Sequence, residues 1–93
     1  MTIGIIGQGY VGTAIKLGFQ EHYKIETYDK FDLAKSTRTK VSDIVEEAKV
    51  IFVCVPTPMR KDGTCYTGIV EEVIREINET ANDHIVVIKS TVP

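Results

Sequence analysis

The chain has 93 residues, of which 43% are hydrophobic and 26% charged, and its formal net charge is −2. This size suits one domain, and the small, scattered charge argues against an electrostatic surface for nucleic acid or an anionic membrane. The longest apolar runs, such as residues 50–55, are far too short to span a bilayer. No signal peptide or disulfide framework is indicated, so we expect a cytoplasmic protein.

Strands and helices are predicted to alternate along the chain. Short apolar or alternating runs predict strands at residues 2–7, 23–29, 50–55 and 84–90. Apolar residues at helical spacing predict helices at residues 11–19, 41–48 and 69–79. The first helix is expected to turn one face inward, formed by Val11, Ala14, Ile15, Gly18 and Phe19. The glutamates of the last helix are expected to face solvent.

This order predicts the α/β class, with a Rossmann-like, doubly wound parallel sheet. Right-handed crossovers place the four strands in the order 2-1-3-4. The strand order then reverses between the first and third strands. Ligands of such sheets bind at that point, outside the carboxyl ends of the strands.

A glycine-rich loop, "GIIGQGYVG", connects the first predicted strand to the first predicted helix. Gly7 would allow a tight turn, Gly9 would let the backbone approach a pyrophosphate, and Gly12 would let the helix lie close to the strand. The N–H groups and the dipole at the helix start favour phosphate. A strand before the loop and a helix after it are the context that a dinucleotide site requires.

Asp29 lies 22 residues after Gly7, at the end of the second predicted strand. A carboxylate at this place accepts hydrogen bonds from the adenosine ribose hydroxyls. It would also repel the 2′-phosphate of NADP, so NAD is the predicted cofactor. Asp32 is a competing acid three residues later.

Four motifs occur together in this chain, namely "GQGYVG", "VCVPTP", "DG" and "KSTVP". In this order and spacing they resemble the N-terminal, NAD-binding part of the UDP-glucose and GDP-mannose dehydrogenase family. The resemblance implies an enzyme that oxidises a nucleotide-sugar alcohol to the acid in two NAD-dependent steps. Its partner would be a nucleotide-sugar substrate, and a homo-oligomer is left open.

The resemblance also implies roles for single residues. Val11 would lie beside the pyrophosphate, and Asp29 would bind the adenosine ribose. Thr57 would contact the cofactor, while Thr91 would lie beside the nicotinamide as the catalytic residue that holds a water or a substrate group. The full cofactor-binding set is Gly7, Gly9, Tyr10, Val11, Gly12, Asp29, Val55, Pro56, Thr57, Ser90 and Thr91.

The family's nucleophilic cysteine and its sugar-nucleotide domain belong to later segments than these. Residues 1–93 are therefore expected to be an incomplete, truncated NAD-binding Rossmann domain that is inactive alone. Cys54 is expected to be a small core residue, and no metal site is expected. Two alternatives remain: the NAD-binding part of a 6-phosphogluconate-type hydroxy-acid dehydrogenase, and a non-catalytic dinucleotide-binding module.

Overall fold

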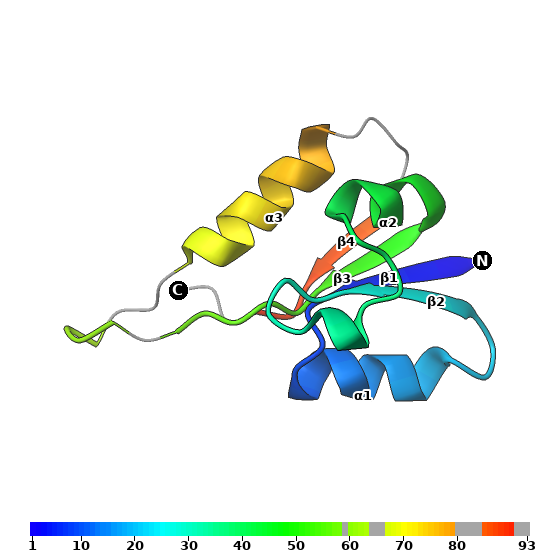
Figure 1. Ribbon diagram of the computed structural model, residues 1–93, viewed down its shortest axis with the longest axis horizontal. Helices are drawn as coiled ribbons and strands as arrows, with labels where there is room; N and C mark the ends of the chain where they lie inside the picture. The colour runs from blue at the N-terminus through cyan, green and yellow to red at the C-terminus, as the bar shows by residue number, and fades with distance from the viewer. Residues whose placement is uncertain (59, 64–66, 80–84, 91–93) are drawn as a thin grey trace.

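Four parallel strands form one sheet, in the order β2-β1-β3-β4, in the computed structural model of the chain (Figure 1). The strands are β1 (Thr2–Ile6), β2 (Lys24–Tyr28), β3 (Val50–Val53) and β4 (Ile85–Ile88). The structure describes residues 1–58, 60–63, 67–79 and 85–90. The predicted strand order is confirmed, and the strand bounds agree with the predicted ones to within two residues.

Three helices cover the two faces of the sheet, as a doubly wound fold requires (Figure 1). They are α1 (Tyr10–Phe19), α2 (Val41–Glu47) and α3 (Gly68–Glu79), and a 3-10 turn, η1 (Leu33–Lys35), follows β2. Helices α2 and α3 lie on one face and α1 lies on the other. The α/β class and the Rossmann-like architecture are therefore those that the alternating pattern predicted.

The main core lies between the sheet and the pair α2 and α3. Apolar side chains at helical spacing on both helices meet the apolar residues of β1 and β3, and their burial drives this packing. The buried members of this cluster are Ile6, Val41, Ile44, Val45, Ala48, Ile51, Val53, Val55, Val70, Val73 and Ile77. The apolar residues at helical spacing in the predicted second helix, Val41, Ile44, Val45 and Ala48, are all among them, so that helix buries the face that its spacing predicts.

Helix α1 is much less buried than its predicted face implied. Gly12 is its only buried residue, although the Phe19 ring stacks on Phe52 with 6.1 Å between centroids. Val11, Ala14 and Gly18 are exposed, so the prediction that they face the sheet is wrong. The physical reason is geometric: α1 is the only described α-helix on its face of the sheet, so no second α-helix covers its sides.

Strand β2 forms one edge of the sheet, as its alternating sequence predicted. Its Glu26 is nevertheless only 7% exposed. The carboxylate accepts hydrogen bonds from Thr37 Oγ1 at 2.7 Å and from Arg38 Nε at 2.9 Å. Arg38 also donates to Glu47, so these contacts join β2 to the segment before α2 and to α2 itself. Pairing of this kind is what makes a buried carboxylate tolerable.

Candidate nucleotide-binding site

A cleft lies at the carboxyl edge of the sheet, over the ends of β1, β2 and β3. It has a volume of about 400 Å³. It is lined by the glycine loop and by the first residues after β2 and β3, namely Gly7, Gln8, Gly9, Tyr10, Val11, Asp29, Phe31, Cys54 and Pro56. The switch point of the strand order, between β1 and β3, is therefore hollowed where ligands of such sheets bind.

Two glycines of the loop are required by the packing of the protein itself. Gly7 has a φ of 101°, and a Cβ built there would lie 2.6 Å from the carbonyl oxygen of Cys54. A Cβ on Gly12 would lie 1.9 Å from the carbonyl oxygen of Gly7. The first glycine therefore allows the loop to turn against β3, and the third allows α1 to begin directly over the loop.

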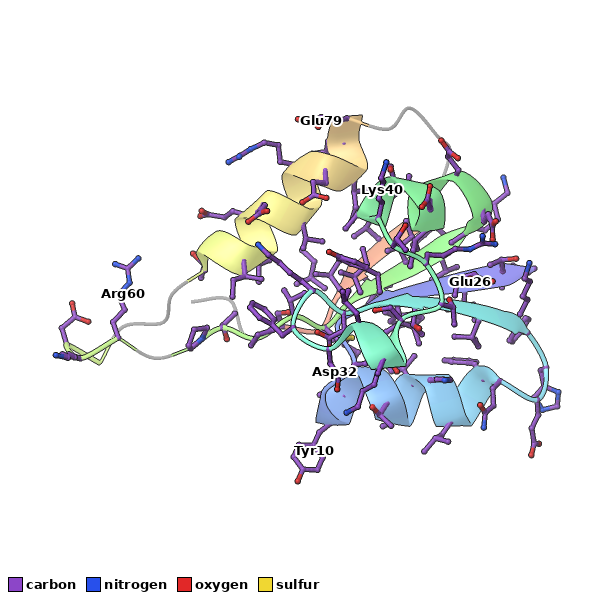
Figure 2. The ribbon with its side chains drawn as sticks, viewed as in Figure 1. Tyr10, Glu26, Asp32, Lys40, Arg60 and Glu79 are labelled. Carbon is purple, nitrogen blue, oxygen red and sulfur yellow. The ribbon has the colours of Figure 1, made fainter. Side chains whose placement is uncertain are left out.

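Gly9 is different, because a Cβ built there would meet no protein atom within 4 Å. The space beside it is open and adjoins the start of α1. The first N–H groups of a helix have no partner within it, and the first turn of α1 carries neither an acidic residue nor a side-chain cap. Tyr10, at the first position, is 98% exposed and points away from the sheet (Figure 2). This end of α1 can accept an anion.

Asp29 lies at the tip of β2 with its carboxylate held on both oxygens. The backbone N–H of Gln8 donates to Oδ2 at 2.8 Å, and that of Phe31 donates to Oδ1 at 2.9 Å. The first contact joins the β2 tip to the glycine loop. Each carboxylate oxygen has a further lone pair, so the fixed group can still accept hydrogen bonds from a ligand.

The basic residues nearest to Asp29 along the chain all lie beside carboxylates. Lys30 Nζ is 3.8 Å from Glu72, Lys35 Nζ is 3.8 Å from Asp32, and Arg38 pairs with Glu26. Lys30 and Lys35 are exposed, so their individual pairs contribute little to stability. Their arrangement matters for selectivity, because a 2′-phosphate here would meet the carboxylate of Asp29 and cations that already have acidic neighbours.

A smaller apolar cavity of about 100 Å³ adjoins the cleft beside Asp29 and Phe31. Helix α3 contributes Ile69, Val73, Glu72 and Glu76 to its lining. Glu76 is half-buried, so the expectation that all the glutamates of this helix face solvent is wrong. Burial and the neighbouring charge of Glu72 raise the pKa of Glu76 above its usual value. The reason is that α3 passes close to the β2 tip.

Of the cofactor-binding residues predicted after β3 and β4, some line the cleft or the small cavity and others do not. Pro56 lines both the cleft and the small cavity, and Val55 lines the cavity. Thr57 is half-buried and belongs to neither lining. Ser90 directs its hydroxyl to the carbonyl oxygen of Val55, at 2.7 Å. Thr91 lies outside the described residues.

Cys54 is half-buried at the end of β3 and also lines the cleft. Burial raises the pKa of its thiol to about 11, against the opposing charge of Lys89. The thiol therefore stays protonated at neutral pH, and a protonated thiol is a poor nucleophile. Within the described ranges, no three His, Cys, Asp or Glu side chains are grouped as metal ligands would be, and no helix could cross a bilayer.

Three residues that line the cleft were not predicted to do so. One is Cys54, which was expected to be a core residue and is instead half-buried at the cleft. The other two are Gln8 and Phe31. Gln8 is buried, its N–H reaches Asp29, and its side-chain amide donates to the Gly7 carbonyl at 3.3 Å. Phe31 is exposed on the rim of both hollows. The residue after the first glycine is variable in the motif, and an exposed aromatic in a polar loop has no periodic signal, so pattern alone could not find either.

Residues 26–93 match the UDP-glucose/GDP-mannose dehydrogenase family, NAD binding domain. The chain belongs to this family. A GDP-mannose 6-dehydrogenase from Pseudomonas aeruginosa is 39% identical over 61 residues, which cover 61% of this chain and 14% of that protein. The family match favours the nucleotide-sugar dehydrogenase reading over the hydroxy-acid dehydrogenase alternative.

Solved structures agree with the fold. A crystal structure of a ternary complex of GDP-mannose dehydrogenase from Pseudomonas aeruginosa has a TM-score of 0.82 and 26% identity, covering 99% of this chain and 29% of that one. A UDP-glucose dehydrogenase from Pyrobaculum islandicum has a TM-score of 0.84 at 23% identity, with the same coverage. The chain thus spans 14% of the length of the curated relatives it matches first.

NAD is the cofactor of this domain family, and the cleft fits it in two respects. The open space beside Gly9 lies where a pyrophosphate would meet the helix start. The fixed carboxylate of Asp29 stands at the strand tip, where ribose hydroxyls are accepted in such folds.

Proposed function

We propose that the cleft binds NAD, with the pyrophosphate at Gly9 and the start of α1 and the adenosine ribose at Asp29. The observation that carries this proposal is the fixed carboxylate of Asp29 beside the open space at Gly9. The Asp29 carboxylate is held by two backbone N–H groups before any ligand arrives, so it needs little reorganisation on binding. The adenine would then lie toward Phe31 and the small apolar cavity.

We propose further that this NAD site serves the oxidation of a nucleotide sugar, in a cytoplasmic enzyme. Bound NAD supplies the hydride acceptor, and the residues of this chain bind and orient it. Thr57, Ser90 and Thr91 are proposed to lie toward the nicotinamide, with Thr91 holding a water or a substrate group. Homo-oligomer formation is compatible with this proposal.

The test of the cofactor site is an equilibrium titration with NAD and NADP. We expect NAD to bind at least about tenfold more tightly, roughly 1.4 kcal/mol, because a 2′-phosphate would be placed against the Asp29 carboxylate. Asp29→Ala should weaken NAD binding and narrow this preference. Equal or tighter binding of NADP by the unaltered protein would contradict the proposal.

The substrate role has its own test. Residues 1–93 alone are proposed not to oxidise UDP-glucose or a related nucleotide sugar, because no activated nucleophile is found among the residues that the structure describes; the Cys54 thiol is protonated at neutral pH. The measurement is NADH absorbance with purified protein and each nucleotide sugar. NADH formation that depends on the sugar would overturn this part.

A further inference from the structure

A short segment lies along the outer edge of β2, and we refer to residues 35–38 as the edge strap (Figure 1). An edge strand normally leaves its outward N–H and C=O groups without a partner in the sheet. Here the backbone N–H groups of Thr37 and Arg38 donate to the carbonyl of Thr27, at 2.9 and 3.1 Å. The Thr27 N–H donates to Thr37 Oγ1 at 2.8 Å. The strap therefore pairs with the edge partly through side-chain hydroxyls.

The hydroxyl of Ser36 makes the corresponding contact one step further, at the tip of the strand. The N–H of Asp29 donates to Ser36 Oγ at 2.8 Å, and Ser36 Oγ lies 3.3 Å from the Asp29 carbonyl oxygen, to which it donates. That carbonyl also accepts the N–H of Asp32, at 3.2 Å. The Asp29 N–H is thus the group that depends most on Ser36.

Asp29 is consequently held both at its backbone and at its side-chain carboxylate. Its backbone is held by Ser36, and its carboxylate is held by the N–H groups of Gln8 and Phe31. A carboxylate that accepts two vicinal hydroxyls must lie within about 0.5 Å of its productive position. The backbone contact of Ser36 is the only one of these that a side-chain substitution can remove cleanly.

We propose that Ser36 is a positioning residue for the adenosine ribose of NAD. Its hydroxyl fixes the backbone of Asp29, and Asp29 in turn accepts the ribose hydroxyls; Ser36 itself does not touch the cofactor. This inference rests on the proposed role of Asp29 at the ribose. Ser36 thereby contributes to affinity through the geometry of another residue.

Thr37 provides a matched control on the same strap. Its hydroxyl also bonds to the β2 backbone, but at Thr27, and it donates to the Glu26 carboxylate at 2.7 Å. Neither contact is made with Asp29, and the Glu26 carboxylate belongs to the pairing with Arg38, which also contacts Glu47. Loss of the Thr37 hydroxyl should therefore lower stability without displacing the Asp29 carboxylate.

The experiment compares dissociation constants for NAD and for NAD that lacks the adenosine 2′-hydroxyl. Ser36→Ala should raise the constant for NAD by about five- to tenfold, the size expected when a hydrogen bond to a charged group is weakened. For the deoxy analogue, Ser36→Ala should raise the dissociation constant by a clearly smaller factor, since the analogue already lacks one of the ribose hydroxyls that Asp29 would accept. Ser36→Thr should restore NAD binding. Thr37→Ala should stay within about twofold on both ligands while its melting temperature falls.

Different outcomes separate this inference from the proposed site. If Asp29→Ala weakens NAD binding and Ser36→Ala does not, the positioning role is wrong and the ribose site stands. If Asp29→Ala has no effect, the ribose site is wrong and this inference falls with it. If Ser36→Ala raises the dissociation constants of NAD and of the deoxy analogue by the same factor, the role of Ser36 is structural and not specific to the ribose. If Ser36→Ala does not fold, the dissociation constants of NAD and of the deoxy analogue are compared in Ser36→Cys instead, whose sulfur is a weaker hydrogen-bonding atom.

Discussion

The two halves of the carboxyl edge are built differently. Over β1 and β2, backbone contacts cross from strand to loop: the Gly7 N–H donates to the Tyr28 carbonyl at 2.8 Å, and the Gln8 N–H donates to Asp29. Over β3 and β4, the Lys89 N–H donates to the Val53 carbonyl at 2.8 Å, but the contact beyond it is made by a side chain, the Ser90 hydroxyl, with the carbonyls of Val55 and Val53. The half proposed for adenosine is assembled from residues 7–36.

The same contrast appears in burial. Strand β1 has Ile3, Ile5 and Ile6 almost fully buried, whereas Ile85 and Ile88 of β4 are 64% and 43% exposed. The apolar side chains of β4 are suited to burial, but few described residues pack against them. The comparison teaches that the glycine loop and the Asp29 carboxylate are held by several neighbours, among them the edge strap and the segment after β3, whereas the apolar side chains of β4 remain exposed among the described residues.

The largest expected effect tests the packing at the first half. Gly12→Ala places a methyl group against the carbonyl of Gly7, a backbone atom that cannot move aside. We expect the free energy of unfolding to fall by about 3 kcal/mol or more. Gly18→Ala, in the same helix, is the control: its Cβ meets nothing, and it should stabilise the protein by about 0.5–1 kcal/mol. Urea unfolding measures both, and equal losses would contradict the close approach.

Gly9→Val tests cofactor binding at the half over β1 and β2 and should leave the packing of the protein there unchanged. The added side chain fills open space, so unfolding free energy should fall by no more than about 1 kcal/mol, mostly from the altered helix cap. NAD affinity should fall by about 100-fold or more, because the side chain occupies the proposed pyrophosphate position. Calorimetric titration measures this loss. Unchanged NAD binding would show that the loop is not the phosphate site.

Thr91→Ala tests the second half, and it is measured in an active nucleotide-sugar dehydrogenase that contains residues 1–93. Turnover should fall by about tenfold or more if the hydroxyl positions a water in the transition state. NAD affinity should change little, because most of the binding is assigned to the loop and Asp29. Thr39→Ala, at an exposed threonine of the first half, is the control. Unaltered turnover in the Thr91 variant would remove its catalytic role.

The smallest expected effect is the loss of stability at low pH through Glu26, on the edge strand β2. Burial alone would raise the pKa of Glu26, but the Thr37 hydrogen bond and the Arg38 charge outweigh burial, and the pKa lies below its ordinary 4.5. A carboxyl with a lowered folded-state pKa stabilises the fold above about pH 4.5, and this is lost as the pH falls through the lowered value. Between about pH 6 and pH 3, the unaltered protein should lose more unfolding free energy than the Glu26→Gln variant, which has no carboxyl group to protonate at this position. Identical pH profiles in urea unfolding would argue against this role.

Much of the fold could be predicted because its determinants are local. The apolar run at residues 50–55 forms the strand that it predicts, with every second residue buried. The helical spacing of Val41, Ile44 and Val45 likewise gives three buried residues on one side of α2. The spacing between Gly7 and Asp29 could be predicted as well, because one strand, one helix and a second strand set it. The structure then brings both residues to one cleft.

The edge strap and the sparse cover of α1 could not be predicted in the same way. The roles of Ser36 and Thr37 depend on how residues 30–40 return along β2, and a polar loop carries no period that reveals its path. The exposure of Val11 and Ala14 depends on which elements stand beside α1, and a helical pattern reports only the suitability of a face for burial. The strap contacts residues 7 and 10 positions earlier in the sequence, but no residue period marks where the chain turns back; the exposure of α1 depends on elements elsewhere in the chain.

The narrow attachment of α1 has a consequence for motion. The helix is held mainly at Gly12, Ile15 and Phe19, whereas α2 buries most of one side. Segments with few buried apolar contacts open at a lower free energy than the rest of a domain, so the amide hydrogens of α1 should exchange with solvent sooner than those of α2. Each opening would carry away the helix end proposed to face the pyrophosphate. A bound dinucleotide would then slow exchange across a whole helix that it touches only at one end.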